Sequence, residues 1–281
     1  MTNSTLHNSS KINNLLKVWP SNGFVATQAW LGEHGISRQL ADSYCKHQWL
    51  ERISRGAYVR SGEAPCLYDA IHALRLLGFK IHIAANAALE WHGVRHYVTV
   101  GQMHAEAEWV FVDQSETKNI PKWFYDCFVK SNLAKLKQTN LFNKWSIGLV
   151  SSDYEIGLQW QKLTGYNDYV LLSSPERAII ECLYLAPQYI SLEHVKLLME
   201  SLRTLRPELC QELLERCVSV KVKRLFLYLA ELSNHSWLKF IDRNKINLGS
   251  GTRQIAKNGQ YIAAYKLAIP DLGGHEGYGK F

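Results

Sequence analysis

The stretch LERISRGAYVR, residues 50–60, decides the fold, because it is a basic segment with the pattern of a short β-hairpin. Alternating apolar residues flank Ser-Arg-Gly, and Gly56 can supply the positive φ that a tight turn requires. Arg52, Arg55 and Arg60 all lie on this hairpin. The segments that precede it indicate why positive charge is placed there.

Three helices are predicted before the hairpin. Residues 11–20, KINNLLKVWP, place apolar side chains at the i, i+3, i+4 and i+7 positions of a helix, which a proline then ends. Thr27 is placed to cap a second short helix, and Gly35 is placed to end it. Ser37 can cap a third helix within residues 37–50. The second and third helices therefore meet at a tight turn.

The third helix has an apolar face and a hydrogen-bonding face. Arg38 and Gln39 lie in its first turn, the part of a recognition helix that usually points at base edges. Three helices followed by a basic hairpin form a winged helix-turn-helix, in which the third helix enters the major groove and the wing lies along the DNA backbone or minor groove. The alternative is a small helical core with a solvated hairpin. The residues predicted to contact DNA are Ser37, Arg38, Gln39, Ser43, Lys46, His47, Arg52, Arg55 and Arg60.

We expect different contacts from the three hairpin arginines. Arg55 at the turn would contact phosphate or a narrow minor groove. Arg52 and Arg60 are expected at phosphates, which hold the register of a protein on DNA without reading its sequence.

The positive charge of the chain is concentrated in two segments. The formal net charge is +7 over 281 residues. Residues 1–60 hold 7 Lys and Arg against 3 Asp and Glu, and residues 203–257 hold 11 against 5. A clustered excess can meet phosphates, whereas a diffuse excess only aids solubility. Both segments are therefore candidates for binding nucleic acid.

The composition is that of a globular protein. Hydrophobic residues make up 47% of the chain and charged residues 20%. No apolar run is long enough for a membrane span, and no signal peptide is evident at the start. We expect a cytoplasmic protein with a winged helix-turn-helix domain at residues 1–62 and an α+β domain at residues 63–281.

The second domain is predicted to be a mixed α+β domain with an antiparallel sheet and a helical C-terminal part. Helices are predicted over PCLYDAIHALRLLG and over NAALEWHG, the latter capped by Asn86, with the strand KIHIAA between them. The short runs EWVFVD, DCFVKS, WSIGLVS and DYVLLSS favour the strands of a small, mostly antiparallel sheet. Further helices are expected after Ser174, after Ser191, from Pro207 and over residues 219–232.

The last of these helices has a mixed surface. Its apolar positions are expected to face inward, while Lys221, Arg224 and Tyr228 share the opposite stripe with Lys223 beside it. A basic stripe that contains tyrosine can bind nucleic acid, and it can equally be a solvated face. The tail at residues 252–270 is expected to form a hairpin with Asn-Gly at its turn.

Signals for catalysis are weak. A metal-dependent nuclease needs clustered carboxylates near a lysine, and Glu106 and Glu108 lie on one strand face without a lysine in register. His92 and His96 have the spacing of a metal pair but no third ligand. The nucleotide-binding and acyl-transfer motifs are missing, and the six cysteines form no C-x-x-C pair. We expect no catalytic residue, metal or cofactor.

Several blocks of the sequence resemble the AbiEi-type antitoxins of type IV toxin-antitoxin systems. ERISRGAYVR after a helix-turn-helix is similar to the winged domain of that family. More specific are IHIAANAALEWHGVRHY, SSPERAIIECLY, LLERCVSVKVKRLFLYLAE and INLGSGTRQIAKNGQY, which are similar to the larger proteobacterial members and occur in the same order. The resemblance spans most of the chain.

The resemblance implies a non-enzymatic antitoxin with two domains, which acts in abortive infection and phage resistance. Its winged domain would repress its own operon by binding inverted repeats in promoter DNA. Its C-terminal domain would counteract a nucleotidyltransferase toxin without forming a stable complex with it. The second basic segment then becomes a candidate antitoxicity surface, with Lys221, Lys223, Arg224, Arg243 and Arg253 as its members.

Two alternatives remain open at this point. One is a nucleic-acid-processing enzyme, such as a nuclease, in which the winged helix-turn-helix domain recognises the substrate. The other is a transcription regulator without a toxin partner.

Overall fold

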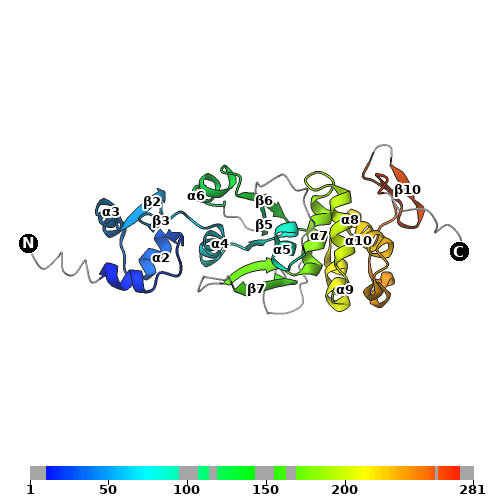
Figure 1. Ribbon diagram of the computed structural model, residues 1–281, viewed down its shortest axis with the longest axis horizontal. Helices are drawn as coiled ribbons and strands as arrows, with labels where there is room; N and C mark the ends of the chain where they lie inside the picture. Colours follow the sequence, from blue (N-terminus) through cyan, green and yellow to red (C-terminus); the bar gives the residue numbers. More distant parts are fainter. Residues whose placement is uncertain are drawn as a thin grey trace, which may run out of the picture. The chain divides into compact units, whose positions relative to one another are not determined.

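The computed structural model describes residues 11–94, 107–113, 119–142, 155–162, 169–256 and 259–272 (Figure 1). These belong to two compact units built from interleaved segments of the chain. The first combines Met1–Ile83, Ala105–Thr139 and Gln159–Leu172, and the second combines Ala84–His104, Asn140–Leu158 and Ser173–Phe281. The domain boundary predicted at residue 62 stays a prediction. Among the described residues, none of the helices is long and apolar enough to cross a membrane.

The predicted winged helix-turn-helix is confirmed in the first unit. Residues 11–17 form the first helix. β1 precedes the other two helices, β2 and β3 follow them, and the three strands form one sheet with the order β1-β3-β2. Both strand pairings are antiparallel. The elements are β1 (Ala26–Thr27), α2 (Gln28–Glu33), α3 (Arg38–Lys46), β2 (Leu50–Ser54) and β3 (Ala57–Arg60).

The local signals for these elements are also confirmed. The hydroxyl of Thr27 accepts a hydrogen bond from the Trp30 amide at 3.2 Å and caps α2. The hydroxyl of Ser37 accepts one from the Leu40 amide at 3.3 Å and caps α3. Gly35 has a φ of 73°, which lets the chain turn between the two helices.

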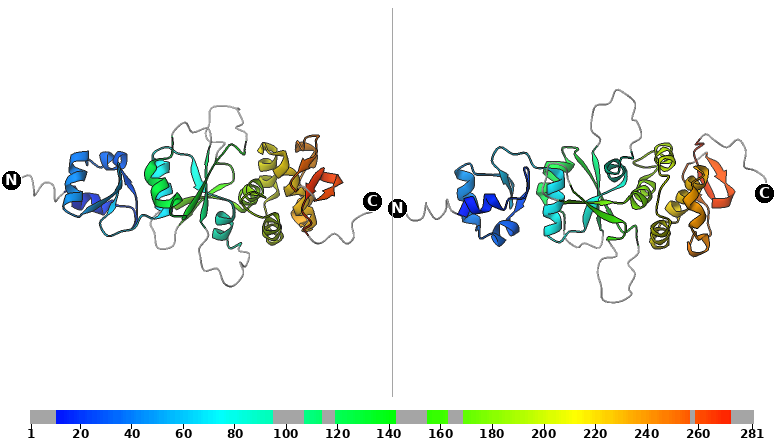
Figure 2. Two further views of the ribbon diagram at one scale, coloured as in Figure 1. Left: turned by 90° about the horizontal axis from the view of Figure 1, so that it is seen from above. Right: turned by 60° about the horizontal axis from the view of Figure 1, so that its bottom comes forward.

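The rest of the first unit is a five-stranded sheet with helices beside it (Figure 2). The strand order is β6-β5-β4-β8-β7, in which β4 pairs antiparallel with β5 and parallel with β8. β5 and β6 are parallel, so the chain must cross over between them. The elements are α4 (Leu67–Leu76), β4 (Ile81–Ile83), β5 (Glu108–Asp113), α6 (Lys122–Phe124), η1 (Tyr125–Val129), β6 (Ala134–Thr139), β7 (Leu158–Lys162) and β8 (Tyr169–Ser173).

Two local predictions in the middle of the chain are wrong, and one lies outside the described residues. The run DCFVKS is helical rather than a strand, because Phe124 and Phe128 are four residues apart and both are buried. Asn86 does not cap α5 (Ala85–Trp91), which begins after Ala84 without a side-chain cap. The run WSIGLVS lies outside the described residues.

The second unit is mainly helical. The helices expected after Ser174, after Ser191 and from Pro207 are all present, with the two serines as caps and Pro207 in the first turn. α7 lies at the centre of the unit and contacts α5, α8, α9 and α10. The helices are α7 (Pro175–Leu185), α8 (Leu192–Ser201), α9 (Pro207–Arg216) and α10 (Val220–Leu232), followed by η3 (Ser236–Phe240) and η4 (Arg243–Lys245).

A small sheet ends the described chain. It contains β9 (Arg253–Gln254), β10 (Gln260–Ile262) and, after η5 (Ala263–Tyr265), β11 (Leu267–Ile269). The predicted hairpin is wrong, because β9 and β10 do not pair with each other. β11 lies between them, antiparallel to β10 and parallel to β9. The asparagine of the predicted turn lies outside the described residues.

Candidate nucleic-acid interface

α3 presents a polar face to solvent. Its apolar side, with Ala41 and Tyr44, is buried in the core of the winged part. Arg38, Gln39 and Lys46 are exposed on the other side. Neither cation forms an ion pair, and none of the three side chains forms a hydrogen bond, with a residue that the structure describes. Their hydrogen-bonding groups are therefore available to a ligand such as DNA.

The turn of the hairpin is short and lies against α2. Gly56 has a φ of 75°, as expected for the turn. Its carbonyl accepts a hydrogen bond from the Gln28 amide at 2.9 Å, which fixes the turn beside the start of α2. Arg55 is exposed at this turn and has no ion-pair partner in the described part of the chain.

Arg52 connects the hairpin to the third helix. Its guanidinium forms an ion pair with the carboxylate of Asp42 on α3. It also donates to the hydroxyl of Tyr58 at 3.3 Å and lies 5.3 Å from the centre of the Tyr58 ring. The Tyr58 hydroxyl in turn donates to Gln28 at 3.3 Å. A single hydrogen-bonded network therefore joins the hairpin, α3 and the start of α2.

Arg60 is also engaged within the protein. It lies 2.7 Å from the Glu63 carboxylate and donates to the side chain of Asn22. Of the three hairpin arginines, Arg55 is thus the one without a partner among the described residues. The sequence predicts DNA contacts for all three arginines, because it does not show that Asp42 and Glu63 lie beside two of them.

The remaining predicted residues lie at the ends of α3. The Ser37 hydroxyl caps the helix, and the Ser43 carbonyl accepts a hydrogen bond from His47 Nδ1 at 2.8 Å. The structure therefore gathers all nine predicted DNA-contacting residues on α3 and the hairpin. Their contacts with DNA stay predictions.

The second predicted surface is only partly exposed. Lys223 and Arg224 are 5% and 2% exposed, so the expectation that they lie on the surface is wrong for these two residues. Lys221 is half-buried, and its ammonium group donates to the carbonyls of Tyr184 and Ala186 at 3.2 and 2.5 Å. The reason is that residues 222–230 are buried on every side of α10. Helical periodicity identifies two faces but does not show that protein covers both.

Arg243 and Arg253 are exposed, as expected. Arg243 lies 3.6 Å from the Glu231 carboxylate. Arg253 has no carboxylate partner in the described part of the chain. The structure therefore leaves two of the five predicted antitoxicity residues fully on the surface.

The family-like block SSPERAIIECLY has a structural role in the second unit. The buried carboxylate of Glu181 accepts hydrogen bonds from the Ala85 amide, the Ser173 hydroxyl and Arg177 Nε at 3.0, 2.7 and 2.8 Å. The buried Arg177–Glu181 ion pair thus has the hydrogen-bond partners that a buried charge requires.

A second ion pair joins Glu176 to Arg206, which donates to both oxygens of the carboxylate. Burial raises the pKa of the Glu176 carboxyl. The hydrogen bonds from Arg206 outweigh this effect and hold that pKa below its ordinary value.

The residues considered for catalysis are not assembled into a site. Glu108 is half-buried and accepts a hydrogen bond from the Tyr68 hydroxyl, while Glu106 lies outside the described residues. A ring nitrogen of His92 lies 2.9 Å from the Ser173 carbonyl, and His96 is likewise outside the described part. Within the described ranges, no three His, Cys, Asp or Glu side chains are grouped to hold a metal.

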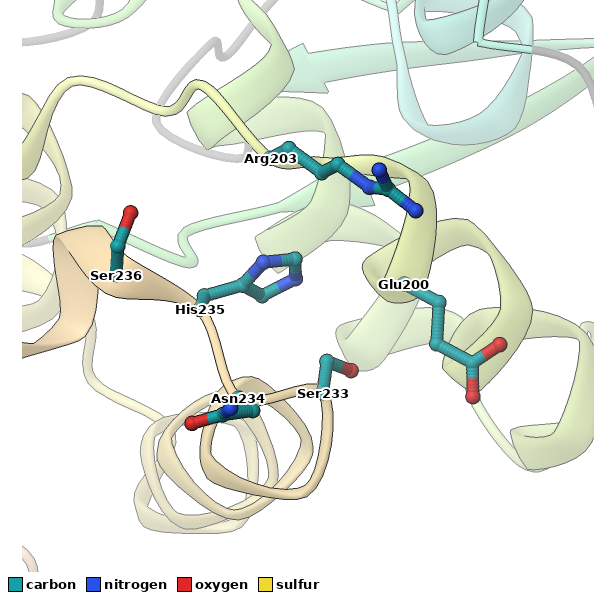
Figure 3. A pocket seen from close by; sticks show the side chains of 6 residues that line it. All are labelled: Glu200, Arg203, Ser233, Asn234, His235 and Ser236. Atoms are coloured by element: carbon teal, nitrogen blue, oxygen red, sulfur yellow. The ribbon is translucent and has the colours of Figure 1, made fainter.

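The second unit also has an open polar pocket of about 580 Å³ (Figure 3). A ring nitrogen of His235 lies 2.7 Å from the Met199 carbonyl, and burial lowers the pKa of the ring. The Ser233 hydroxyl is buried without a hydrogen-bond partner among the described residues. The pocket is lined by Glu200, Arg203, Ser233, Asn234, His235 and Ser236.

Two family profiles match the chain. The profile described as "Transcriptional regulator, AbiEi antitoxin, Type IV TA system" matches residues 106–270. The profile described as "Transcriptional regulator, AbiEi antitoxin N-terminal domain" matches residues 8–100. A search of curated proteins gave no match.

Solved structures provide a comparison of the fold. The crystal structure of the RV2827C protein from Mycobacterium tuberculosis matches with a TM-score of 0.55, over 94% of this chain and 91% of that chain. The two sequences are 15% identical. This likeness extends over both units and concerns the fold alone.

Proposed function

The chain belongs to the AbiEi family of type IV antitoxins and transcriptional regulators, and we propose that it represses its own operon through the winged helix-turn-helix. In this proposal α3 enters the major groove at inverted repeats in the promoter. The C-terminal part counteracts a nucleotidyltransferase toxin without forming a stable complex with it. The protein would work in the cytoplasm, where its operator is.

The DNA-binding proposal rests on one observation. Several side chains of α3 and the hairpin are exposed and have no ion-pair partner among the described residues. Arg38 and Gln39 lie in the first turn of α3, from which they can reach base edges. Lys46 at the other end of the helix and Arg55 at the turn are suited to phosphates. We assign readout of bases to the first two residues and anchoring to the last two.

Operator binding by the full-length protein tests this proposal. We expect the triple change Arg38→Ala, Lys46→Ala and Arg55→Ala to weaken binding to a duplex that carries the promoter region. If all three cations bind phosphate, the slope of log K against log salt should become shallower by about 0.9 for each phosphate that the variant no longer neutralises. If Arg38 reads a base instead, the slope should change by about 1.8, and the affinity loss should differ between operator and unrelated DNA.

The matched control removes three exposed cations elsewhere: Lys130→Ala, Lys162→Ala and Arg203→Ala. This variant loses the same net charge and should keep both the affinity and the slope. Unchanged operator binding by the first variant, or equal losses in both, would rule out α3 and the hairpin as the DNA interface.

The antitoxin proposal is supported by family membership and by the exposed cations of the second basic segment. Arg243 and Arg253 remain candidates for the antitoxicity surface, because they are exposed. Lys223 and Arg224 are no longer candidates for direct contact, because both side chains are buried. A nucleotidyltransferase reading frame immediately downstream would support this part, whereas its absence would favour a regulator without a toxin partner.

A further inference from the structure

Arg224 organises a glycine-rich loop around its buried guanidinium. Its Nε donates to the Leu248 carbonyl at 2.8 Å, and its two terminal nitrogens donate to the carbonyls of Gly249 at 3.0 Å and Gly251 at 2.6 Å. A fourth bond, 3.2 Å long, reaches the Lys266 carbonyl directly before β11. The loop between η4 and β9 is therefore wrapped around one cation through its carbonyl oxygens.

The loop also contains backbone amides that have no acceptor in the described part of the chain. The Gly249 amide donates to the Asn247 side chain, and the Arg253 amide donates to the Lys266 carbonyl. Between them, the exposed residues Ser250, Gly251 and Thr252 have no acceptor for their amides in the described part of the chain. Consecutive backbone N–H groups in a turn form a concave site that favours anions.

The side chains of Arg253 and Lys266 place positive charge at the loop. The pKa of Arg224 is lowered by burial and then by the nearby charge of Arg253. Among the described residues, neither Arg253 nor Lys266 is paired with a carboxylate. Two acidic side chains of this region are engaged elsewhere, because Glu231 accepts a hydrogen bond from Tyr265 and Asp242 lies 4.0 Å from Lys245. An anion bound at the loop would supply the missing negative charge.

An exposed aromatic ring lies on the same small sheet. Tyr261 is 54% exposed, and both it and Gln254 are paired with Ala268, so the three residues form one row across the sheet. Residues that are paired in this way point to the same face. Arg253 is paired with Leu267 and therefore points to the other face of β9, at the end of the loop. An exposed ring on the same small sheet as basic side chains can stack on a base of single-stranded nucleic acid.

We propose that the loop at residues 249–253, together with Lys266 and Tyr261, is a binding site for the phosphate backbone of single-stranded nucleic acid. The amides of Ser250, Gly251 and Thr252 bind a phosphate, Arg253 and Lys266 contribute charge, and Tyr261 stacks on a base. Arg224 is a positioning residue, because it orients the loop without reaching the ligand. None of these residues belongs to the winged helix-turn-helix. Binding of nucleic acid to the site can therefore be measured separately from operator binding, and without a toxin.

Fluorescence anisotropy of a labelled oligouridylate or oligothymidylate of about 12 nucleotides tests the site; for comparison, an OB-fold that binds single strands contacts roughly 4–16 nucleotides. The starting protein is the full-length chain that already carries Arg38→Ala, Lys46→Ala and Arg55→Ala, so that the winged part does not contribute. Adding Arg253→Ala and Lys266→Ala should weaken binding roughly ten- to thirtyfold at 0.1 M salt and make the salt slope shallower by about 1.4. The matched control adds Arg203→Ala and Lys239→Ala, which remove two exposed cations of the same unit, and it should bind like the starting protein.

Amide chemical shifts provide a second measurement that does not depend on substitution. In ¹⁵N–¹H spectra, the oligonucleotide should shift the amides of Ser250, Gly251 and Thr252 more strongly than those of the polar pocket in Figure 3. A mononucleotide at the same phosphate concentration should shift them far less, because it lacks the neighbouring phosphates and bases.

Two results would overturn the proposal. Equal affinity and slope in the Arg253→Ala and Lys266→Ala protein, with unshifted loop amides, would show that no such site exists. Equal shifts with mononucleotide and oligonucleotide would show an anion site that does not recognise a nucleic-acid strand. Neither result would affect operator binding by the winged part, so failure here is distinguishable from failure of the proposed repressor function.

Discussion

At the level of single residues, Arg224 shows how burial changes the role of a cation. The residue is 2% exposed, and four backbone carbonyls accept hydrogen bonds from its guanidinium. Arginine suits this position because its planar group carries five donors in fixed directions. Its sequence neighbours do not reveal this role, since the carbonyls come from residues 248, 249, 251 and 266.

We expect Arg224→Lys to destabilise the protein although the charge is kept. The guanidinium reaches the carbonyls of Leu248, Gly249 and Gly251 through three separate nitrogens, whereas a lysine ammonium carries its donors on one nitrogen and cannot reach all three. An unsatisfied buried polar group costs about 1–3 kcal/mol. Urea unfolding at pH 7 measures the change. Arg253→Lys is the control, because Arg253 is exposed and its change should stay within about 0.5 kcal/mol. Equal unfolding midpoints for the two variants would contradict the structural role of Arg224.

At the level of helices and strands, the sequence predicts what depends on nearby residues. The caps at Thr27, Ser37, Ser174 and Ser191 follow from side chains that reach an amide three residues away. The turn at Gly56 follows from the positive φ that glycine tolerates. These signals are sufficient to predict the three helices and hairpin of the winged part, and with it the position of the candidate DNA interface.

Features that depend on distant partners could not be predicted in this way. Residues 125–129 have the composition of a strand, but packing of two phenylalanines makes them helical. The strands β9 and β10 flank an Asn-Gly turn signal, yet β11 comes between them. In the candidate interface, the carboxylates beside Arg52 and Arg60 come from other segments. Residue type alone therefore overestimates how many arginines are available to DNA.

The link between the hairpin and α3 gives a prediction that separates two roles of Arg52. If Arg52 positions α3 through Asp42, Arg52→Met should weaken operator binding while leaving the salt slope unchanged. If it contacts phosphate instead, the slope should become shallower by about 0.9, as is expected for Arg55→Met. The measurement is operator affinity at several salt concentrations.

A double-mutant cycle with Asp42→Asn completes this test. Because an exposed ion pair contributes about 0.2–1 kcal/mol, the effect of Arg52→Met should shrink by that amount once Asp42 is neutral. Additive effects of the two substitutions would contradict the positioning role.

At the level of the whole molecule, the two basic segments belong to different compact units. Residues 1–60 lie in the first unit, and residues 203–257 lie in the second. The strand order and the interleaving of the units could not be predicted from the sequence, because parallel strands such as β5 and β6 are joined by long connections rather than by turn signals. The concentration of positive charge in two segments, in contrast, is visible in the sequence, and the two segments belong to different units of the structure.

This division predicts that repression and antitoxicity can be separated by substitution. Arg38→Ala, Lys46→Ala and Arg55→Ala should abolish repression of a promoter reporter but leave rescue of growth from the toxin intact. Arg243→Ala with Arg253→Ala should do the opposite, because these exposed side chains lie in the unit without the winged part. Both variants are expressed from an independent promoter, so that loss of repression does not change their expression. Their stability should also be similar, because substitutions at exposed surface residues change it by about 0.5 kcal/mol at most. Loss of both activities in either variant would mean that antitoxicity requires DNA binding, and the two basic segments would then serve one function rather than two.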